Sequence, residues 1–312
     1  MYDEPIKLGS FNMYKFSYRS DREISKNLEK IAEIIRDNFD ILAMQEVFNE
    51  ETIRRLLFYL GNDWVYRWEA PTSNYKSAQI SEGYAYLWKK SKFRLATGRQ
   101  SEDDTAPGAN RVFQPRIHHQ YARDPILVDG RLARDPFYIR LESVYGWYEI
   151  RLINTHIIFG DSADIEKRQR ELEALINIYC KISDKVYRSC RPFYTFLLGD
   201  YNLNLPRAWT KKPYLQETVE KTENGKLLKR VVTMQDQLTT LKNRSQQKPD
   251  DPVRGFSNNY DHFSFDELRF EGMQLPVCTR IDTVRKYCND DFELHRKDIS
   301  DHIPICLNFS FV

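Results

Sequence analysis

The chain has 312 residues, of which 29% are charged and 41% hydrophobic, and its formal net charge is +2. A chain of this length can bury a full hydrophobic core. The near-neutral charge argues against a globally basic nucleic-acid-binding protein, so any phosphate binding has to be local. No apolar run approaches the length of a membrane span, and we therefore expect no membrane partner.

The cysteines and the start of the chain bear on its cellular setting. Five cysteines, an odd number, lack the spacing of a metal site and predict reduced, partly buried thiols. Such thiols favour a cytoplasmic protein, which we expect to be a monomer. The first predicted strand begins about Ile6 and leaves no room for a signal peptide, although a secreted form numbered after processing remains the alternative.

The first 60 residues alternate between predicted strands and helices. Residues 6–13 and 40–44 have the apolar pattern of strands. An amphipathic helix is predicted from a capping box at Ser20 through Ile35, and a second helix over 50–60 ends at Gly61. This order of elements indicates an α/β fold.

The middle of the chain adds strands of mixed direction. Aromatic strand-like runs occupy 64–68 and 84–88, and 137–141 and 148–153 flank a turn, which predicts an antiparallel hairpin. A wholly parallel sheet is therefore not expected. A long helix is predicted over 162–179, a buried strand over 193–198 and a final strand over 303–311.

Residues 206–255 are polar and show little periodicity. They contain eleven Lys or Arg against six Asp or Glu, a local excess of five positive charges. Together with Trp209 and Tyr214 this charge could hold a nucleic-acid backbone, but a solvated loop explains the composition equally well. We therefore interpret 1–312 as a single catalytic domain with a basic insert at about 206–255.

Polar side chains stand at the ends of most predicted strands. Hydrolysis of a phosphodiester needs a cation to neutralise the phosphate, a base for water and an acid for the leaving oxygen. Carboxylates without competing thiolates suit a hard cation, Mg²⁺ or Mn²⁺, and two histidines are suited to acid and base near neutral pH. The residues of this set are Asn12, Glu46, Glu82, His156, Asp200, Asn202, Asp261, Asp301 and His302.

The order of these motifs resembles the endonuclease/exonuclease/phosphatase superfamily, and within it the deoxyribonuclease I-like branch. The shared motifs are Phe11-Asn12, Gln45-Glu46-Val47, Thr155-His156, Gly199-Asp200-Tyr201-Asn202, Tyr260-Asp261 and Ser300-Asp301-His302-Ile303-Pro304. Glu82, just before an aromatic strand, and the triplet Arg134-Asp135-Pro136 are similar to residues of the deoxyribonuclease I branch. The resemblance implies a four-layered α/β sandwich, with two mixed sheets face to face and helices outside.

The resemblance also implies roles for the site residues. His302, held by Asp261, would be the general base, and His156, paired with Glu82, would protonate the leaving oxygen. The metal would be bound by Glu46, Asn12, Asp200 and Asp301, and the phosphate by Asn12, Arg134 and Asn202, with Asp200 and Asn202 also assisting catalysis. The implied function is a Mg²⁺-dependent phosphodiesterase acting on nucleic acid, with a DNA-nicking endonuclease as the leading hypothesis.

Several residues differ from those of the deoxyribonuclease I-like branch, so the sequence also allows other substrate classes. Tyr14, Phe48 and His262 stand where deoxyribonuclease I has arginines. A phospholipid or inositol-phosphate hydrolase is the alternative, but the sequence shows neither an exposed apolar hairpin nor the Pro-Ala-Trp-Cys-Asp-Arg motif of inositol 5-phosphatases. A non-enzymatic binding module would be expected to lack an acid, base or metal residue, and none is missing. His295 is interpreted as a solvated residue of a charged loop.

Overall fold

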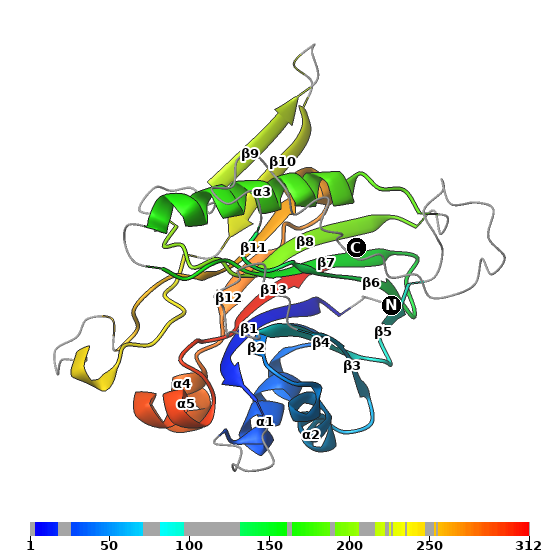
Figure 1. Ribbon diagram of the computed structural model, residues 1–312. Helices are drawn as coiled ribbons and strands as arrows, with labels where there is room; N and C mark the ends of the chain where they lie inside the picture. Colours follow the sequence, from blue (N-terminus) through cyan, green and yellow to red (C-terminus); the bar gives the residue numbers. More distant parts are fainter. Residues whose placement is uncertain are drawn as a thin grey trace.

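The computed structural model describes residues 4–17, 26–70, 82–96, 132–160, 164–187, 191–205, 216–221, 225, 227–234, 236–246, 253 and 255–311. Two mixed β-sheets pack face to face, and helices cover their outer faces (Figure 1). This is the predicted four-layered α/β sandwich. The arrangement lets each sheet bury one face against the other and the opposite face against helices.

The first sheet has six strands in the order β12-β13-β1-β2-β4-β3. β1 and β2 are parallel, and the other neighbouring strands are antiparallel. The strands are β1 (Ile6–Phe16), β2 (Ile41–Val47), β3 (Trp64–Glu69), β4 (Gly83–Lys89), β12 (Val277–Arg280) and β13 (Ile305–Phe309). On the outer side of this sheet lie α1 (Leu28–Asn38), α2 (Glu50–Leu60), α4 (Thr283–Cys288) and α5 (Phe292–Asp298) (Figure 1).

The second sheet has seven strands in the order β5-β6-β7-β8-β11-β10-β9. β7 and β8 are parallel, and β6 and β7 form the predicted antiparallel hairpin. The strands are β5 (Phe93–Leu95), β6 (Phe137–Ser143), β7 (Glu149–His156), β8 (Phe193–Asp200), β9 (Gln216–Lys221), β10 (Leu227–Met234) and β11 (Asp261–Asp266). The long helix α3 (Ile165–Ser183) covers its outer face, and short 3₁₀ turns occupy Arg244–Gln246 and Glu267–Phe270 (Figure 1).

The hydrophobic core between the sheets draws side chains from both of them. Leu8 and Ile41 of the first sheet belong to one buried cluster with Phe196 and Leu198 of the second. The rings of Phe196 and Phe309 lie 5.0 Å apart between centroids, a normal distance for a packed aromatic pair. The core therefore holds the strand ends of the two sheets in a fixed relative position.

The first helix begins later than the sequence predicted. Its N-cap is Asn27, whose Oδ1 accepts a hydrogen bond from the Lys30 N–H at 3.0 Å, and α1 starts at Leu28. An asparagine at this position satisfies one of the free N–H groups of the first turn. The predicted capping box at Ser20 lies outside the described residues.

The interpretation of 206–255 as an insert without regular structure is wrong for its central part. β9 and β10 form a hairpin, and β10 pairs antiparallel with β11 in the second sheet. Val231 and Val232 are buried in the core, which gives this hairpin a place in the sheet despite the polar composition around it. Lys229 pairs with Asp184 at 2.6 Å, so this cation is engaged within the fold.

Candidate active site

The pairing of strands in the second sheet brings together three polar residues that stand at strand ends. His156 lies opposite Asp200 across the parallel β7–β8 pair, and Asp261 lies opposite Asp200 across the antiparallel β8–β11 pair. Strands in register end at one edge of a sheet, so their terminal side chains share that edge. The same edge meets the end of β1, where Asn12 donates a hydrogen bond to Asp200 Oδ2 at 2.9 Å.

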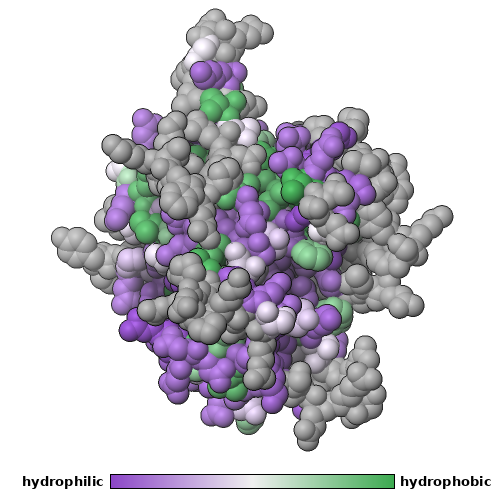
Figure 2. Space-filling view, turned by 90° about the vertical axis from the view of Figure 1, so that its left-hand side faces the viewer, coloured by the Kyte–Doolittle hydropathy of each residue, from purple (hydrophilic) through white to green (hydrophobic). Residues whose placement is uncertain are grey.

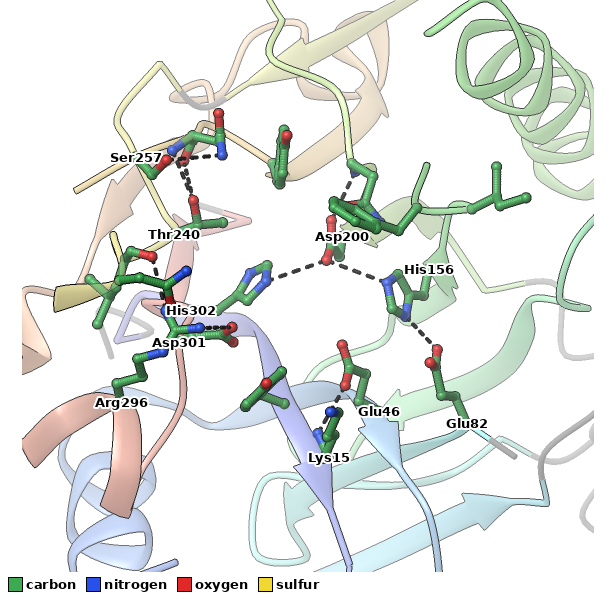
Figure 3. Close-up of a pocket in the computed structure, with 18 of the residues that line it drawn as sticks. Lys15, Glu46, Glu82, His156, Asp200, Thr240, Ser257, Arg296, Asp301 and His302 are labelled. Carbon is green, nitrogen blue, oxygen red and sulfur yellow. Dashed lines mark hydrogen bonds and ion pairs between the residues drawn. The ribbon is translucent and has the colours of Figure 1, made fainter. Parts of the chain in front are cut away.

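A pocket of about 890 Å³ opens at this edge (Figure 3). Its volume falls within the range of pockets that hold small ligands. Eight predicted site residues line it: Glu46, Glu82, Arg134, His156, Asp200, Asn202, Asp301 and His302. Tyr260, which precedes Asp261, also lines it. The remaining two predicted site residues, Asn12 and Asp261, lie behind this lining and contact it through hydrogen bonds.

Each of the two pocket histidines has a carboxylate at one ring nitrogen and faces Asp200 with the other. His302 Nδ1 lies 2.8 Å from Asp261 Oδ2, and His156 Nδ1 lies 3.1 Å from Glu82 Oε2. Asp200 Oδ2 is 3.5 Å from His156 Nε2 and 3.6 Å from His302 Nε2 (Figure 3). The predicted pairings are therefore present, and the two rings flank one central carboxylate.

Arg134 supports the pair formed by Glu82 and His156. Its Nη2 lies 2.5 Å from Glu82 Oε2, and its Nη1 donates to the carbonyl oxygen of His156 at 3.1 Å. Burial alone would raise the pKa of Glu82, but His156 and Arg134 together hold that pKa below its usual value. Glu82 is therefore a carboxylate that orients the ring of His156 near neutral pH.

The His302 ring lies in a strongly negative environment. Burial disfavours the charged ring, but Asp261, Asp200 and Asp301 outweigh this effect and raise the pKa of His302 to about 10. In the protein without a bound cation, His302 is thus protonated at neutral pH. A positive charge beside these carboxylates would lower this pKa and allow the ring to accept a proton.

A strained bulge at the end of β1 orients the carboxylate of Glu46. Tyr14, Lys15 and Glu46 have positive φ angles of 45°, 54° and 57°, an unusual conformation for residues other than glycine. The Lys15 N–H donates to Glu46 Oε2 at 2.8 Å, and the Tyr14 N–H donates to Asn12 Oδ1 at 2.9 Å. Strain of this kind persists where surrounding contacts enforce it, and it is concentrated at functional sites.

Asn12 bridges the carboxylates of the two sheets. Its Nδ2 donates to Glu46 Oε1 at 3.1 Å and to Asp200 Oδ2 at 2.9 Å. Because its oxygen accepts from the Tyr14 N–H, the amide presents donors rather than an acceptor to the pocket. The ligation of a metal by Asn12 stays a prediction.

Asn202 and Asp200 are held by the tight turn that follows β8. The Asn202 N–H donates to Asp200 Oδ1 at 2.8 Å, and Asn202 Nδ2 donates to the carbonyl oxygen of Ile157 at 2.8 Å. Gly199 has a φ of +144°, and a Cβ there would lie 1.9 Å from the carbonyl oxygen of Thr155. Only glycine allows β7 and β8 to approach this closely at the site.

The donor set of the pocket fits a hard divalent cation. Asp301 Oδ1 is buried, and within the described part of the chain no group donates a hydrogen bond to it. One ligand atom each from Asp200, Asp261 and His302 also lies within 4.8 Å of the others. Oxygen-rich sites without thiolates suit Mg²⁺ or Mn²⁺.

Ser300 and His295, to which the sequence assigned no role in the site, hold the loop before His302. Ser300 Oγ donates to the Asn12 carbonyl oxygen at 2.7 Å and accepts from the His302 N–H at 3.1 Å. His295 Nδ1 contacts the Ser300 carbonyl oxygen at 2.8 Å, and its Nε2 contacts Thr283 Oγ1 at 2.7 Å. The interpretation of His295 as a solvated residue is wrong, because its side chain is completely buried in α5.

The burial of two histidines predicts that the folded protein becomes less stable in acid. Burial lowers the pKa of His262 and of His295 to about 4, against about 6.5 in an unfolded chain. Between these values the unfolded state binds protons that the folded state does not, so stability falls as the pH falls from 6.5 towards 4. Each ring contributes about 3 kcal/mol at most to this loss.

Urea unfolding of the wild type and of His295→Gln at pH 7, 6, 5 and 4.5 measures this effect. We expect the variant to be less stable at pH 7 but to lose less stability on acidification. An identical pH dependence in the two proteins would show that His295 titrates normally.

The chain belongs to the Endonuclease/Exonuclease/phosphatase family, whose sequence profile matches residues 9–302. This is a family of metal-dependent hydrolases that act on phosphodiester bonds. A deoxyribonuclease of Thioalkalivibrio sp. (strain K90mix) is 26% identical over 202 residues, which cover 64% of this chain and 46% of that protein. The chain therefore matches less than half the length of this relative.

Solved structures show the same fold at low sequence identity. An endonuclease/exonuclease/phosphatase from Bacteroides vulgatus is 12% identical, with a TM-score of 0.54 and 98% of both chains covered. TDP2 from Caenorhabditis elegans is 15% identical with a TM-score of 0.53, covering 99% of this chain and 75% of that one. ANGEL2, a 2′,3′-cyclic phosphatase, is 15% identical with a TM-score of 0.53, covering 99% and 97%. These similarities establish the fold.

Proposed function

We propose that this protein is a Mg²⁺-dependent nuclease that hydrolyses phosphodiester bonds of nucleic acid, with DNA as the leading substrate. The observation that carries this proposal is the central carboxylate Asp200 between the Nε2 atoms of His156 and His302, 3.5 and 3.6 Å away. Two oriented imidazoles on opposite sides of one position suit acid and base catalysis on a single phosphate. The similarity to a deoxyribonuclease supports nucleic acid as the substrate class.

The two histidines take different roles in this proposal. His302, oriented by Asp261, accepts the proton of the attacking water at Nε2. His156, oriented by Glu82 and Arg134, donates a proton from Nε2 to the leaving oxygen. The negative charge around His302 makes it a strong base once its proton has been released.

The carboxylates on the first-sheet side of the pocket would hold the metal. We assign Glu46 and Asp301 as the metal ligands, with Asp200 contributing from the second sheet. When bound, a divalent cation neutralises charge on the phosphate and polarises it. Asn12 and Asn202 then act by positioning: the first bridges Glu46 and Asp200, and the second fixes Asp200 through its backbone N–H.

A panel of substrates tests the proposal directly. Supercoiled plasmid, linear duplex, single-stranded DNA, RNA and sphingomyelin would each be incubated with the protein, with Mg²⁺ or with EDTA. We expect nicking of the plasmid with Mg²⁺ and no cleavage in EDTA. Cleavage of the lipid alone, or of nucleic acid equally well in EDTA, would contradict the proposal.

Lipid hydrolysis is the second candidate, and one surface feature bears on it. The turn between β6 and β7 exposes Tyr145 (82%) and Trp147 (65%), an apolar turn that the sequence analysis did not identify. This turn precedes β7, whereas His156 ends that strand, so they lie about 25 Å apart along eight residues of strand. A membrane bound at the turn would therefore lie far from the reacting groups.

A further exposed apolar side chain lies at the pocket itself, because Phe159 is 68% exposed and lines it. In the face shown in Figure 2, hydrophobic residues form small separate patches among hydrophilic ones. None of the helices in the described ranges combines the length and the hydropathy required to cross a bilayer. The proposed preference for nucleic acid rests on the similarity to a deoxyribonuclease, and the sphingomyelin arm of the substrate panel tests the alternative.

A further inference from the structure

Tyr14, at the bulge in β1, lies among three cationic side chains, two of which come from other parts of the chain. Its ring centroid is 5.1 Å from Lys15 Nζ, 5.6 Å from Lys26 Nζ and 5.9 Å from the central guanidinium carbon of Arg296. All three distances are within the range of cation–π contacts. The side chains of Lys15, Lys26 and Arg296 therefore place three positive charges around this ring, at one side of the pocket.

Two of these cations face the pocket itself. Lys15 and Arg296 line it, as Tyr14 does. In Figure 3, Lys15 lies beside Glu46, and Arg296 lies beside Asp301. Lys15 is an exposed residue, whereas Lys26 is half-buried and donates to the Ile299 carbonyl oxygen at 2.7 Å. Lys15 is thus free to reach a ligand in solution.

Arg296 retains hydrogen-bonding capacity towards the pocket. Its Nη1 donates to the Leu241 carbonyl oxygen at 3.2 Å, and its Nη2 lies 3.4 Å from Asp301 Oδ2. A guanidinium has five N–H donors in a planar fork, which suits a phosphate group. These two contacts fix the orientation of the side chain without using all of its donors.

Among the described residues that line the pocket, Arg134 is the one lysine or arginine besides Lys15 and Arg296. Arg134, the remaining arginine in the described lining, is 14% exposed and paired with Glu82 at 2.5 Å. The described lining also includes neutral polar residues, which are Thr240, Asn243, Gln246, Ser257 and Asn258. A second phosphate of a substrate would therefore be attracted to the Tyr14 side.

We propose that Lys15 and Arg296, held against Tyr14, form a second phosphate subsite that binds the phosphate next to the scissile one. The proposal rests on the proposed function and makes it more specific, because it assigns oligonucleotides rather than phosphate esters with one phosphate as the preferred substrates. The subsite is built from two elements far apart in the chain, the bulge in β1 and α5.

The test compares Lys15→Gln with the wild type on two substrates, a DNA 12-mer and bis(4-nitrophenyl) phosphate, which has a single phosphate. This substitution removes the charge and keeps the backbone N–H that Lys15 donates to Glu46. We expect KM for the 12-mer to rise about 10-fold with little change in kcat. The slope of log affinity against log salt should become less steep by about one, because one phosphate contact is lost. The parameters for bis(4-nitrophenyl) phosphate should stay within about twofold.

Lys297→Gln is the matched control, because Lys297 is an exposed lysine on the same helix as Arg296 and does not line the pocket. It should leave both substrates unaffected. Equal effects of Lys15→Gln on both substrates, or none on either, would overturn the subsite while leaving the proposed function intact. Failure of the wild type to cleave the 12-mer with Mg²⁺ would instead contradict the proposed function itself.

Discussion

Replacing His302 with alanine is expected to lower kcat on a phosphodiester substrate by about 10²-fold or more, the usual scale for a lost general base. His156→Ala should cause a loss of similar size through the leaving oxygen. Both rings face Asp200 Oδ2 at about the same distance, and in the proposed mechanism they act on one phosphate. The double variant should therefore lose far less than the product of the two single losses.

Single-turnover kinetics with saturating Mg²⁺ would measure these losses. Glu82→Gln should resemble a weaker form of His156→Ala, since it changes only the partner at Nδ1. His262→Gln provides a control, because His262 is a buried histidine next to Asp261 that does not line the pocket. Wild-type turnover in either single alanine variant would remove that histidine from the mechanism.

Glu46→Gln is expected to reduce Mg²⁺-dependent activity by about 10²-fold or more while leaving the free energy of unfolding nearly unchanged. The glutamine oxygen can still accept from the Lys15 N–H, whereas its amide nitrogen cannot accept from Asn12 Nδ2, which is a small loss. The substitution also removes the charge that would hold a cation. Its residual activity should rise when the concentration of Mg²⁺ or Mn²⁺ is increased.

Titration of activity against metal concentration distinguishes this effect from misfolding. Glu50→Gln is a suitable control, because Glu50 lies on α2 and pairs with Arg54 at the surface. Full activity of Glu46→Gln in EDTA would contradict the assignment of Glu46 as a metal ligand. Thermal unfolding of both variants would check that the fold is retained.

Much of the architecture could be predicted from local sequence patterns. The apolar run that ends at Gly199 and the helix from Glu50 to Leu60 appear in the structure as predicted. These elements depend on periodicity, capping and the conformational freedom of glycine, all of which act over a few residues. The order of the motifs around Asp200 also identified the family, which residues 9–302 match.

The sequence by itself determined which residues would stand at the strand ends, because strand boundaries are set by local chemistry. Only the tertiary structure decided how those residues meet. Asn12 bridges Glu46 and Asp200 across the two sheets, and Arg134 pairs with Glu82, each through contacts between residues far apart in the chain. The burial of His295 and the place of β10 in the second sheet were likewise missed. Both depend on packing against distant elements, and no local pattern of polarity encodes that packing.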